Sequence, residues 1–206
     1  MQEDVLTKAI NQLARIFGIQ VIEPENKKGS FILVNALKEN ADEEGSHHIS
    51  WSDQENAQLG LTFVLLGVVF MSGGKTSEEN LFKFLKHLGL YEESGRNKRQ
   101  RAGPDTSSDT IVESEVAELY DGDVKKFVND VLVSRQHYLK RDRVETGDPE
   151  LEQYEYTWGE RARLEVRESD VFRMVCELHE CEPRMFKEQY DKVVASEGEE
   201  VLADFE

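Results

Sequence analysis

Three residues near the carboxyl end carry side chains suited to metal binding or thiol chemistry. Cys176, His179 and Cys181 have the spacing C-x2-H-x-C. Structural zinc needs four ligands, usually held on turns and not within one helix end. The spacing therefore favours ordinary helix-end residues over a metal site. The chain has only these two cysteines, so a disulfide framework is not expected and a reducing compartment fits better.

No other motif indicates catalysis. The stretch Ser72-Gly-Gly-Lys75 lacks the Gly-x4-Gly spacing that precedes the lysine of a phosphate-binding loop. It is more typical of a turn between helices. His47 and His48 lie in a polar segment with no third ligand nearby, which indicates solvated side chains. We therefore expect a chain that is not an enzyme and that takes no cofactor, no metal and no small-molecule substrate.

Basic side chains that could contact phosphates form two clusters in an acidic chain of net charge −17. Arg96 to Arg101 could wrap phosphates or act as a nuclear-import signal, and a solvated linker is equally plausible. The second cluster lies on and beside an expected β-hairpin and could release counterions from a DNA duplex. A charged, solvated strand edge is an equal alternative there. The second cluster consists of Lys125, Lys126, Arg135, Lys140, Arg141 and Arg143.

The first half of the chain predicts a helix, a hairpin and two further helices. Apolar residues recur at helical spacing from Val5 to Phe17, and two β-branched runs around a Gly-containing turn then predict a hairpin. Asn56 to Met71 predicts a buried helix, and its apolar run is shorter than the ~20 residues of a membrane span. Thr76 to Glu79 fits a capping box that starts the next helix.

The second half of the chain also predicts helices and a hairpin, after a segment poor in apolar residues, Glu92 to Asp109. A second hairpin ends at Trp158, and alternation places Tyr154, Tyr156 and Trp158 on one face, which we expect to be buried. Glu160 to Glu180 predicts one long amphipathic helix. Pro183 suits the start of a closing helix that runs to about Ala195, and the acidic tail after it is expected to fray. The fold class is mainly α with small β-hairpins, and a helix feeding a two-stranded wing twice suggests tandem winged-helix modules.

The expected long helix carries an apolar face wider than a single seam. Its buried stripe is Leu164, Val171, Met174, Val175 and Leu178. Phe172 and Cys176 widen that face, which leaves room for a groove that accepts a partner helix. A closing helix that merely covers the core is the somewhat more favoured alternative at any single position.

Two long stretches resemble the signatures of the MAGE homology domain. They are GLTFVLLGVVFMSGGKTSEENLFKFLKHLGLY (Gly60 to Tyr91) and GDVKKFVNDVLVSRQHYLKRDRVETGDPELEQYEYTWGERARLE (Gly122 to Glu165). The first hairpin, in FGIQVIEPENKKGSFILVN, also matches, and the resemblance covers about Leu6 to Tyr190. Glu160 departs from the pattern, because the family usually has proline after the Trp-Gly pair.

The resemblance implies a division of the chain into two winged-helix modules. We expect module A in residues 1–91, a flexible basic and polar linker in 92–109, module B in 110–195 and an acidic tail in 196–206. The family normally has two more helices before the first one seen here. The leucine pair that contacts RING proteins in the family lies in that part, so no residue is carried over for it.

The resemblance also implies an adaptor. Single-copy members of the family are subunits of the DNA-repair complex of the structural-maintenance-of-chromosomes (SMC) type. This implies a nuclear, chromatin-associated protein that bridges a RING-type ubiquitin ligase subunit and a kleisin subunit, contacts double-stranded DNA, and involves no membrane. The alternative is a regulator of a RING ubiquitin ligase without a chromosomal role. We expect the kleisin to contact Phe127, Val131 and Phe172.

Overall fold

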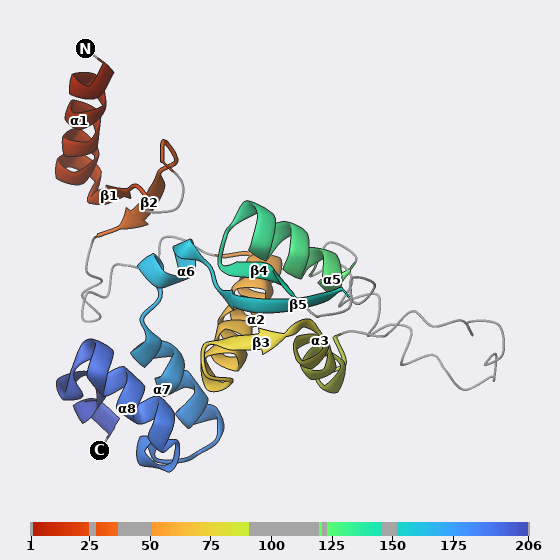
Figure 1. Cartoon of the computed structure of the whole chain (residues 1–206). Helices are drawn as coiled ribbons and strands as arrows, with labels where there is room; N and C mark the ends of the chain where they lie inside the picture. The colour runs from red at the N-terminus through yellow and green to blue at the C-terminus, as the bar shows by residue number, and fades with distance from the viewer. Residues whose placement is uncertain are drawn as a thin grey trace.

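The computed structural model describes residues 2–24, 28–36, 51–90, 120, 123–145 and 152–205. Over these residues the chain is mainly helical, with two small antiparallel sheets (Figure 1). The expected fold class is confirmed at this level. The predicted linker 92–109, the basic run Arg96 to Arg101 and the histidine pair His47 and His48 lie outside the described residues.

The N-terminal elements are a helix and a hairpin, as predicted. Helix α1 (Gln2–Gln12) continues as a π-helical stretch, η1 (Leu13–Phe17). Gly18 ends it at a φ of 63°, in the left-handed region that favours glycine. Strands β1 (Ile19–Ile22) and β2 (Ile32–Asn35) then pair antiparallel. Figure 1 shows this pair of elements beside the larger body of the protein, with β2 nearest to α6.

The central helix of the larger body is α2 (Asp53–Met71), which covers the predicted buried helix. It begins with a capping box, which is not among the predictions from the sequence. The Ser52 hydroxyl oxygen accepts a hydrogen bond from the Glu55 amide, and the Glu55 carboxylate accepts one from the Ser52 amide. By length and composition alone α2 could cross a membrane. However, Leu65, Leu66 and Val69 are fully buried against the other elements, which makes α2 the core helix of a folded module.

A short strand, β3 (Lys75–Ser77), follows α2 and was not predicted. Helix α3 (Glu78–His87) comes directly after it. The predicted capping box at Thr76 to Glu79 is wrong in register. Ser77 caps α3 by accepting a hydrogen bond from the Asn80 amide, whereas Thr76 belongs to the strand and is buried.

The second sheet has three strands in the order β3-β5-β4. Strands β4 (Leu139–Val144) and β5 (Gln153–Trp158) form the predicted second hairpin. Strand β3 pairs with β5, so that Lys75 lies opposite Thr157. The sheet therefore joins residues that the expected boundary at 92–109 would assign to different modules.

A three-residue helix, α5 (Val124–Lys126), leads into the π-helical stretch η2 (Phe127–Arg135), and together they pack beside the hairpin (Figure 1). After the hairpin the predicted single helix is wrong. The chain forms α6 (Glu160–Glu165) and α7 (Glu168–Leu178), and Val166 between them is extended, with φ −118° and ψ 126°. The break lets α7 turn back and pack along α2.

The C-terminal segment packs more than the sequence indicates. A 3-10 turn, η3 (Pro183–Met185), precedes α8 (Lys187–Glu197), which replaces the predicted closing helix. A further 3-10 stretch, η4 (Glu199–Phe205), follows, and Leu202 is buried. The expected fraying of the acidic tail is wrong for these residues, because an apolar side chain anchors them.

One core joins α2, α3, η2, the three-stranded sheet and α7. Its largest fully buried side chains include Tyr156, Phe70, Phe127, Phe172, Leu132 and Leu139. The predicted apolar stripe of α7 is only partly correct: Val171 and Val175 are buried, whereas Leu178 is 68% exposed. Leu178 lies at the end of the helix, beyond the reach of the elements that cover its middle.

Candidate functional site

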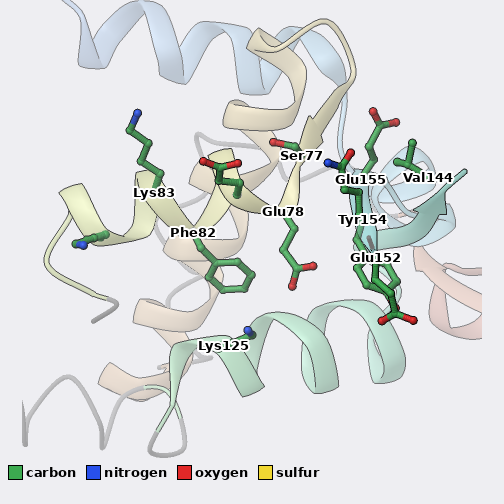
Figure 2. Close-up of a pocket in the computed structure, with 12 residues that line it drawn as sticks. Ser77, Glu78, Phe82, Lys83, Lys125, Val144, Glu152, Tyr154 and Glu155 are labelled. Carbon is green, nitrogen blue, oxygen red and sulfur yellow. The ribbon is translucent and has the colours of Figure 1, made fainter. Parts of the chain in front are cut away.

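A groove of about 730 Å³ lies between α3, the hairpin and the start of α5 (Figure 2). The residues that line it are Ser77, Glu78, Glu79, Phe82, Lys83, Lys86, Lys125, Val144, Glu152, Gln153, Tyr154 and Glu155. Strand β3 ends at Ser77, opposite Glu155 of β5, and the chain turns there into α3. The start of β5 therefore lines the groove without a strand beside it on the α3 side.

The α3 side of the groove is mixed in charge. Lys83 and Lys86, three residues apart on α3, lie on one face of that helix and form a lysine cluster with Lys125, whereas Glu78 and Glu79 of the same helix also line the groove. Lys125 places its ammonium 5.2 Å from the centroid of the Phe82 ring, a cation–π distance. Lys125 is one of the cations predicted from the sequence, whereas Lys83 and Lys86 are not, although their spacing on a helix indicates a shared face.

The opposite wall, on the hairpin, is acidic and aromatic, and Arg141 is held between its Tyr154 and Glu78 of α3. The guanidinium carbon of Arg141 lies 3.6 Å from the centroid of the Tyr154 ring. Its Nη2 donates to Oε2 of Glu78 over 2.9 Å, whereas its buried Nε has no hydrogen-bond partner among the described residues. A guanidinium held between an aromatic ring and a carboxylate is a structural link between β4 and α3, and it contributes little free charge to the surface.

The other two predicted cations of the β4–β5 hairpin also form ion pairs. Lys140 lies 2.9 Å from Asp142, and Arg143 lies 3.5 Å from Glu152. These pairs are exposed, so each adds little to stability. They nevertheless cancel the local charge: the three predicted cations of the wing face three carboxylates.

The three remaining predicted cations form no ion pair with the residues that the structure describes. Lys125 and Lys126 are exposed at the start of the helix that leads to η2, and Arg135 is exposed at its end. The six predicted DNA contacts therefore form two groups. Three are exposed cations of the α5–η2 helix without an ion pair to a described residue, and three are cations of the β4–β5 hairpin that are each paired with a carboxylate.

Tyr156 connects the β4–β5 hairpin to the helix beside it. Its side chain is fully buried, and its hydroxyl donates to Oδ1 of Asn129 in η2 over 2.7 Å. Burial, with the nearby Glu78 carboxylate, raises the pKa of this phenol well above its usual value. The hydroxyl stays protonated at neutral pH and ties the hairpin to η2.

The predicted kleisin contacts do not form one groove. Phe172 is fully buried, and its ring packs on those of Phe70 and Phe186, with centroids 5.9 and 6.4 Å away. The expectation that it lies at the margin of the core is wrong. Phe127 is 1% exposed and packs on Tyr120.

These two phenylalanines also lie far apart along α2. The Tyr120 hydroxyl, beside Phe127, reaches the carbonyl of Ala57, whereas Phe172 contacts Phe70. Phe70 lies thirteen positions after Ala57 in α2, a rise of about 20 Å. Of the three predicted contacts, only Val131 keeps part of its surface.

A second surface stands out on the N-terminal elements. The apolar side chains that define α1, η1 and their hairpin remain largely exposed, although their helical spacing predicted burial. They are Val5, Leu6, Ile16, Phe17, Phe31 and Leu33, with exposed fractions from 41% to 66%. Many exposed apolar side chains on a small unit mark a candidate site of association. We call these six residues of α1, η1 and the hairpin the apolar face of α1.

Cys176 and Cys181, at the end of α7, carry free thiols. His179 lies between these two cysteines in the C-x2-H-x-C spacing, and its ring packs on Phe186, with centroids 6.0 Å apart. In the part of the chain that the structure describes, no group of three or more His, Cys, Asp or Glu residues is placed to hold a metal ion.

Comparisons with known proteins agree on one family. The model of the MAGE homology domain matches residues 2–169. The human non-structural maintenance of chromosomes element 3 homolog is 30% identical over 94% of this chain and 54% of its own length. The mouse protein of the same name is 31% identical over 94% of this chain and 59% of its own length. The chain thus spans somewhat over half of these relatives.

Two further matches extend the picture. Human melanoma-associated antigen F1 is 27% identical over 97% of this chain and 56% of its own length. Among solved structures, a chain of the Nse1-Nse3-Nse4 complex matches with a TM-score of 0.69 and 26% identity, covering 94% of this chain and 79% of that one. The family model, the relatives and the fold lead to the same conclusion. The chain belongs to the MAGE homology domain family.

Proposed function

We propose that this chain is a non-enzymatic adaptor subunit of an SMC-type DNA-repair complex, and that it acts in the nucleus on chromatin. The observation that carries the proposal is the match over 94% of the chain to a chain of the Nse1-Nse3-Nse4 complex. The similarity to the element 3 homologs of human and mouse points the same way. The partners follow from the family resemblance: a RING-type subunit and a kleisin subunit.

We further propose that the larger body is one winged-helix module. Helix α2, strand β3, helix α3, the α5–η2 helix and the β4–β5 hairpin follow the helix–strand–helix–helix–hairpin order of that fold. Its sheet order, β3-β5-β4, places the short strand beside the wing. In this assignment module B begins at α2 and not at residue 110, and module A is represented by α1 and its hairpin.

The two modules offer separate surfaces for two partners. The apolar face of α1 is the proposed docking surface for the RING-type subunit, because exposed apolar side chains such as Ile16 and Phe17 gain most from being covered. Kleisin binding is proposed for module B. Its contacts must come from surface residues, since Phe127 and Phe172 are internal.

Duplex DNA is the third proposed partner, and the contact lies on the helical side of module B. Lys125 joins Lys83 and Lys86 of α3 in the lysine cluster at the groove, and Lys126 is exposed next to Lys125 in the sequence. None of these four lysines forms an ion pair with a described residue. Such lysines release counterions when they meet phosphates. The wing cations, held by carboxylates, contribute less.

Salt-dependent binding of a duplex tests this assignment. The double variant Lys125→Glu/Lys126→Glu should weaken binding and lower the slope of log K against log salt by about 2, one for each lost phosphate contact. Lys187→Glu, a charge reversal at the start of α8, serves as the matched control and should leave the slope unchanged. A slope that stays constant in the double variant would remove the α5–η2 helix from the DNA surface.

The alternative function is a regulator of a RING ubiquitin ligase without a chromosomal role. Co-expression with the RING-type and kleisin-type subunits separates the two possibilities. An SMC-complex subunit should purify with both partners, and Ile16→Asp should lose the RING-type subunit alone. Leu88→Asp, at the exposed leucine that directly follows α3, is the control. Recovery of the RING-type subunit without any kleisin would favour the alternative.

A further inference from the structure

Helix α7 ends in a hydrogen-bonded turn that brings the two cysteines of the chain together. The Cys181 amide donates to the Cys176 carbonyl, and the Glu180 amide donates to the Glu177 carbonyl, each over 3.1 Å. Glu180 has a φ of 49°, in the left-handed region. This combination is a Schellman motif, in which the residue after the turn contacts the last full turn of the helix.

The motif fixes the separation of the two cysteines. Their backbones are joined by one hydrogen bond of 3.1 Å, which keeps the Cα atoms within roughly 7 Å of each other. A disulfide needs Cα atoms about 4.4–6.8 Å apart and side chains on the same side of the turn. The two residues meet this second condition, because both line one small depression at the end of α7.

The two cysteines differ in their access to solvent. Cys176 is 1% exposed, whereas Cys181 is half-buried, and both line a depression of about 260 Å³ with Glu177, Glu180 and Glu182. Three carboxylates at the mouth repel an anionic oxidant such as glutathione disulfide and leave a small neutral one unhindered. The depression therefore selects oxidants by charge.

We propose that Cys176 and Cys181 form a reversible redox site, which hydrogen peroxide converts to an intramolecular disulfide at the end of α7. The disulfide closes the Schellman turn covalently without moving α7. Neither thiol takes part in the proposed contacts with DNA or the RING-type subunit, so the redox site is tested on the isolated chain, separately from those contacts.

The reaction begins at Cys181, which is the thiol with access to solvent. Its sulfur attacks one peroxide oxygen, the O–O bond breaks, and the products are a sulfenic acid and water. The Cys176 sulfur then attacks the Cys181 sulfur, the S–O bond breaks, and the hydroxide leaves with the Cys176 proton as a second water. Two thiols are oxidised and one peroxide is reduced to two waters.

Burial, together with the neighbouring Cys181, raises the pKa of the Cys176 thiol to about 12. Cys176 is therefore fully protonated at neutral pH and does not react with peroxide itself. It serves as the resolving thiol, whose proton is released only when the adjacent sulfenic acid forms. This division of roles gives the single-cysteine variants different outcomes.

The test treats the reduced, full-length chain with hydrogen peroxide at neutral pH and measures the intact mass and, after denaturation, the number of alkylatable thiols. Wild type should lose both thiols together, become about 2 Da lighter, and recover both with dithiothreitol. Cys176→Ala should instead trap the sulfenic acid, detected with dimedone. Cys181→Ser should keep its buried thiol. Melting temperatures of all three proteins confirm that they are folded.

A control variant addresses the turn itself. Glu180→Gly keeps the left-handed conformation and should form the disulfide at least as readily as wild type. Three results would overturn the proposal in folded wild-type protein: both thiols remaining alkylatable, a gain of about 32 Da from sulfinic acid with Cys176 still free, or a disulfide between two chains.

Discussion

The indole Nε1 of Trp158 donates a hydrogen bond to the carbonyl oxygen of Leu66, over 3.0 Å. The bond joins the last residue of the wing to the middle of α2, and both partners are buried. A buried indole that finds a carbonyl in this way combines a large apolar contact with a satisfied donor. It fixes the hairpin, and with it the acidic wall of the groove, relative to the core helix.

Removing the Trp158 side chain should therefore destabilise the protein strongly. We expect Trp158→Ala to lower the free energy of unfolding by about 3–5 kcal/mol, because it leaves a cavity and an unused acceptor. Trp158→Phe keeps most of the apolar contact and should cost less. Urea unfolding of the three proteins measures both differences. An alanine variant as stable as wild type would show that the ring contributes nothing to the core.

The local sequence pattern correctly predicts the elements that are held together by contacts between residues close in the sequence. The two hairpins follow from short β-branched or aromatic runs around turn residues, and their pairing confirms the prediction. The same alternation correctly placed Tyr156 and Trp158 in the core, although Tyr154 on the same face is half-buried, because it sits at the edge and stacks on Arg141.

Other features depend on neighbours that are distant in sequence. Strand β3 has only three residues, too few for a pattern, and it exists because β5 offers a free edge. The pairing of Arg141 with Glu78 arises only when β4 and α3 are brought side by side. The sequence therefore predicts six cations for a DNA surface, but it does not indicate which of them pair with carboxylates in the folded chain.

Gly159 provides a test of close packing behind the wing. A Cβ atom there would lie 2.1 Å from the carbonyl oxygen of His137, a backbone atom that cannot move aside. The Gly159 amide also donates to the Tyr138 carbonyl over 2.8 Å, so the two segments cannot separate without losing this bond. Gly159→Ala should cost at least about 2 kcal/mol of stability.

The matched control is Gly60→Ala. Gly60 lies on the exposed side of α2, and a Cβ there meets nothing within 4 Å. Alanine should stabilise the helix by about 0.5–1 kcal/mol. Thermal melts of the two variants should shift in opposite directions. A Gly159→Ala protein that melts like wild type would show that the two segments are not held at this distance.

Tyr138 predicts a loss of stability at alkaline pH. Its hydroxyl donates to Oε2 of Glu165 over 2.5 Å, and burial, followed by the interaction with Glu165, raises its pKa to about 12. The folded state thus favours the neutral phenol, whose pKa in an unfolded chain is about 10. This contribution to stability is complete below about pH 10 and is lost as the pH rises toward about 12.

The measurement is the free energy of unfolding as a function of pH, for wild type and for Tyr138→Phe. Wild type should lose stability more steeply between about pH 10 and 12, because the phenylalanine variant has no proton to release at this position. Tyr156, whose pKa is also raised by burial, leaves a residual decline in both proteins. Identical pH profiles would contradict the role of Tyr138.

Phe172 distinguishes a core residue from a partner contact. The side chain has no exposed surface, and its ring lies between Phe70 of α2 and Phe186 at the start of α8. Phe172→Ala should therefore lower stability by about 3–5 kcal/mol and weaken binding of the kleisin, the RING-type subunit and DNA in parallel. Phe172→Leu, which refills most of the volume, should restore stability and all three interactions together. Melting temperature, co-purification of both subunits and duplex affinity report the four quantities. Selective loss of the kleisin from an alanine variant that melts normally would instead show that Phe172, buried in the free chain, becomes exposed and contacts the kleisin in the complex.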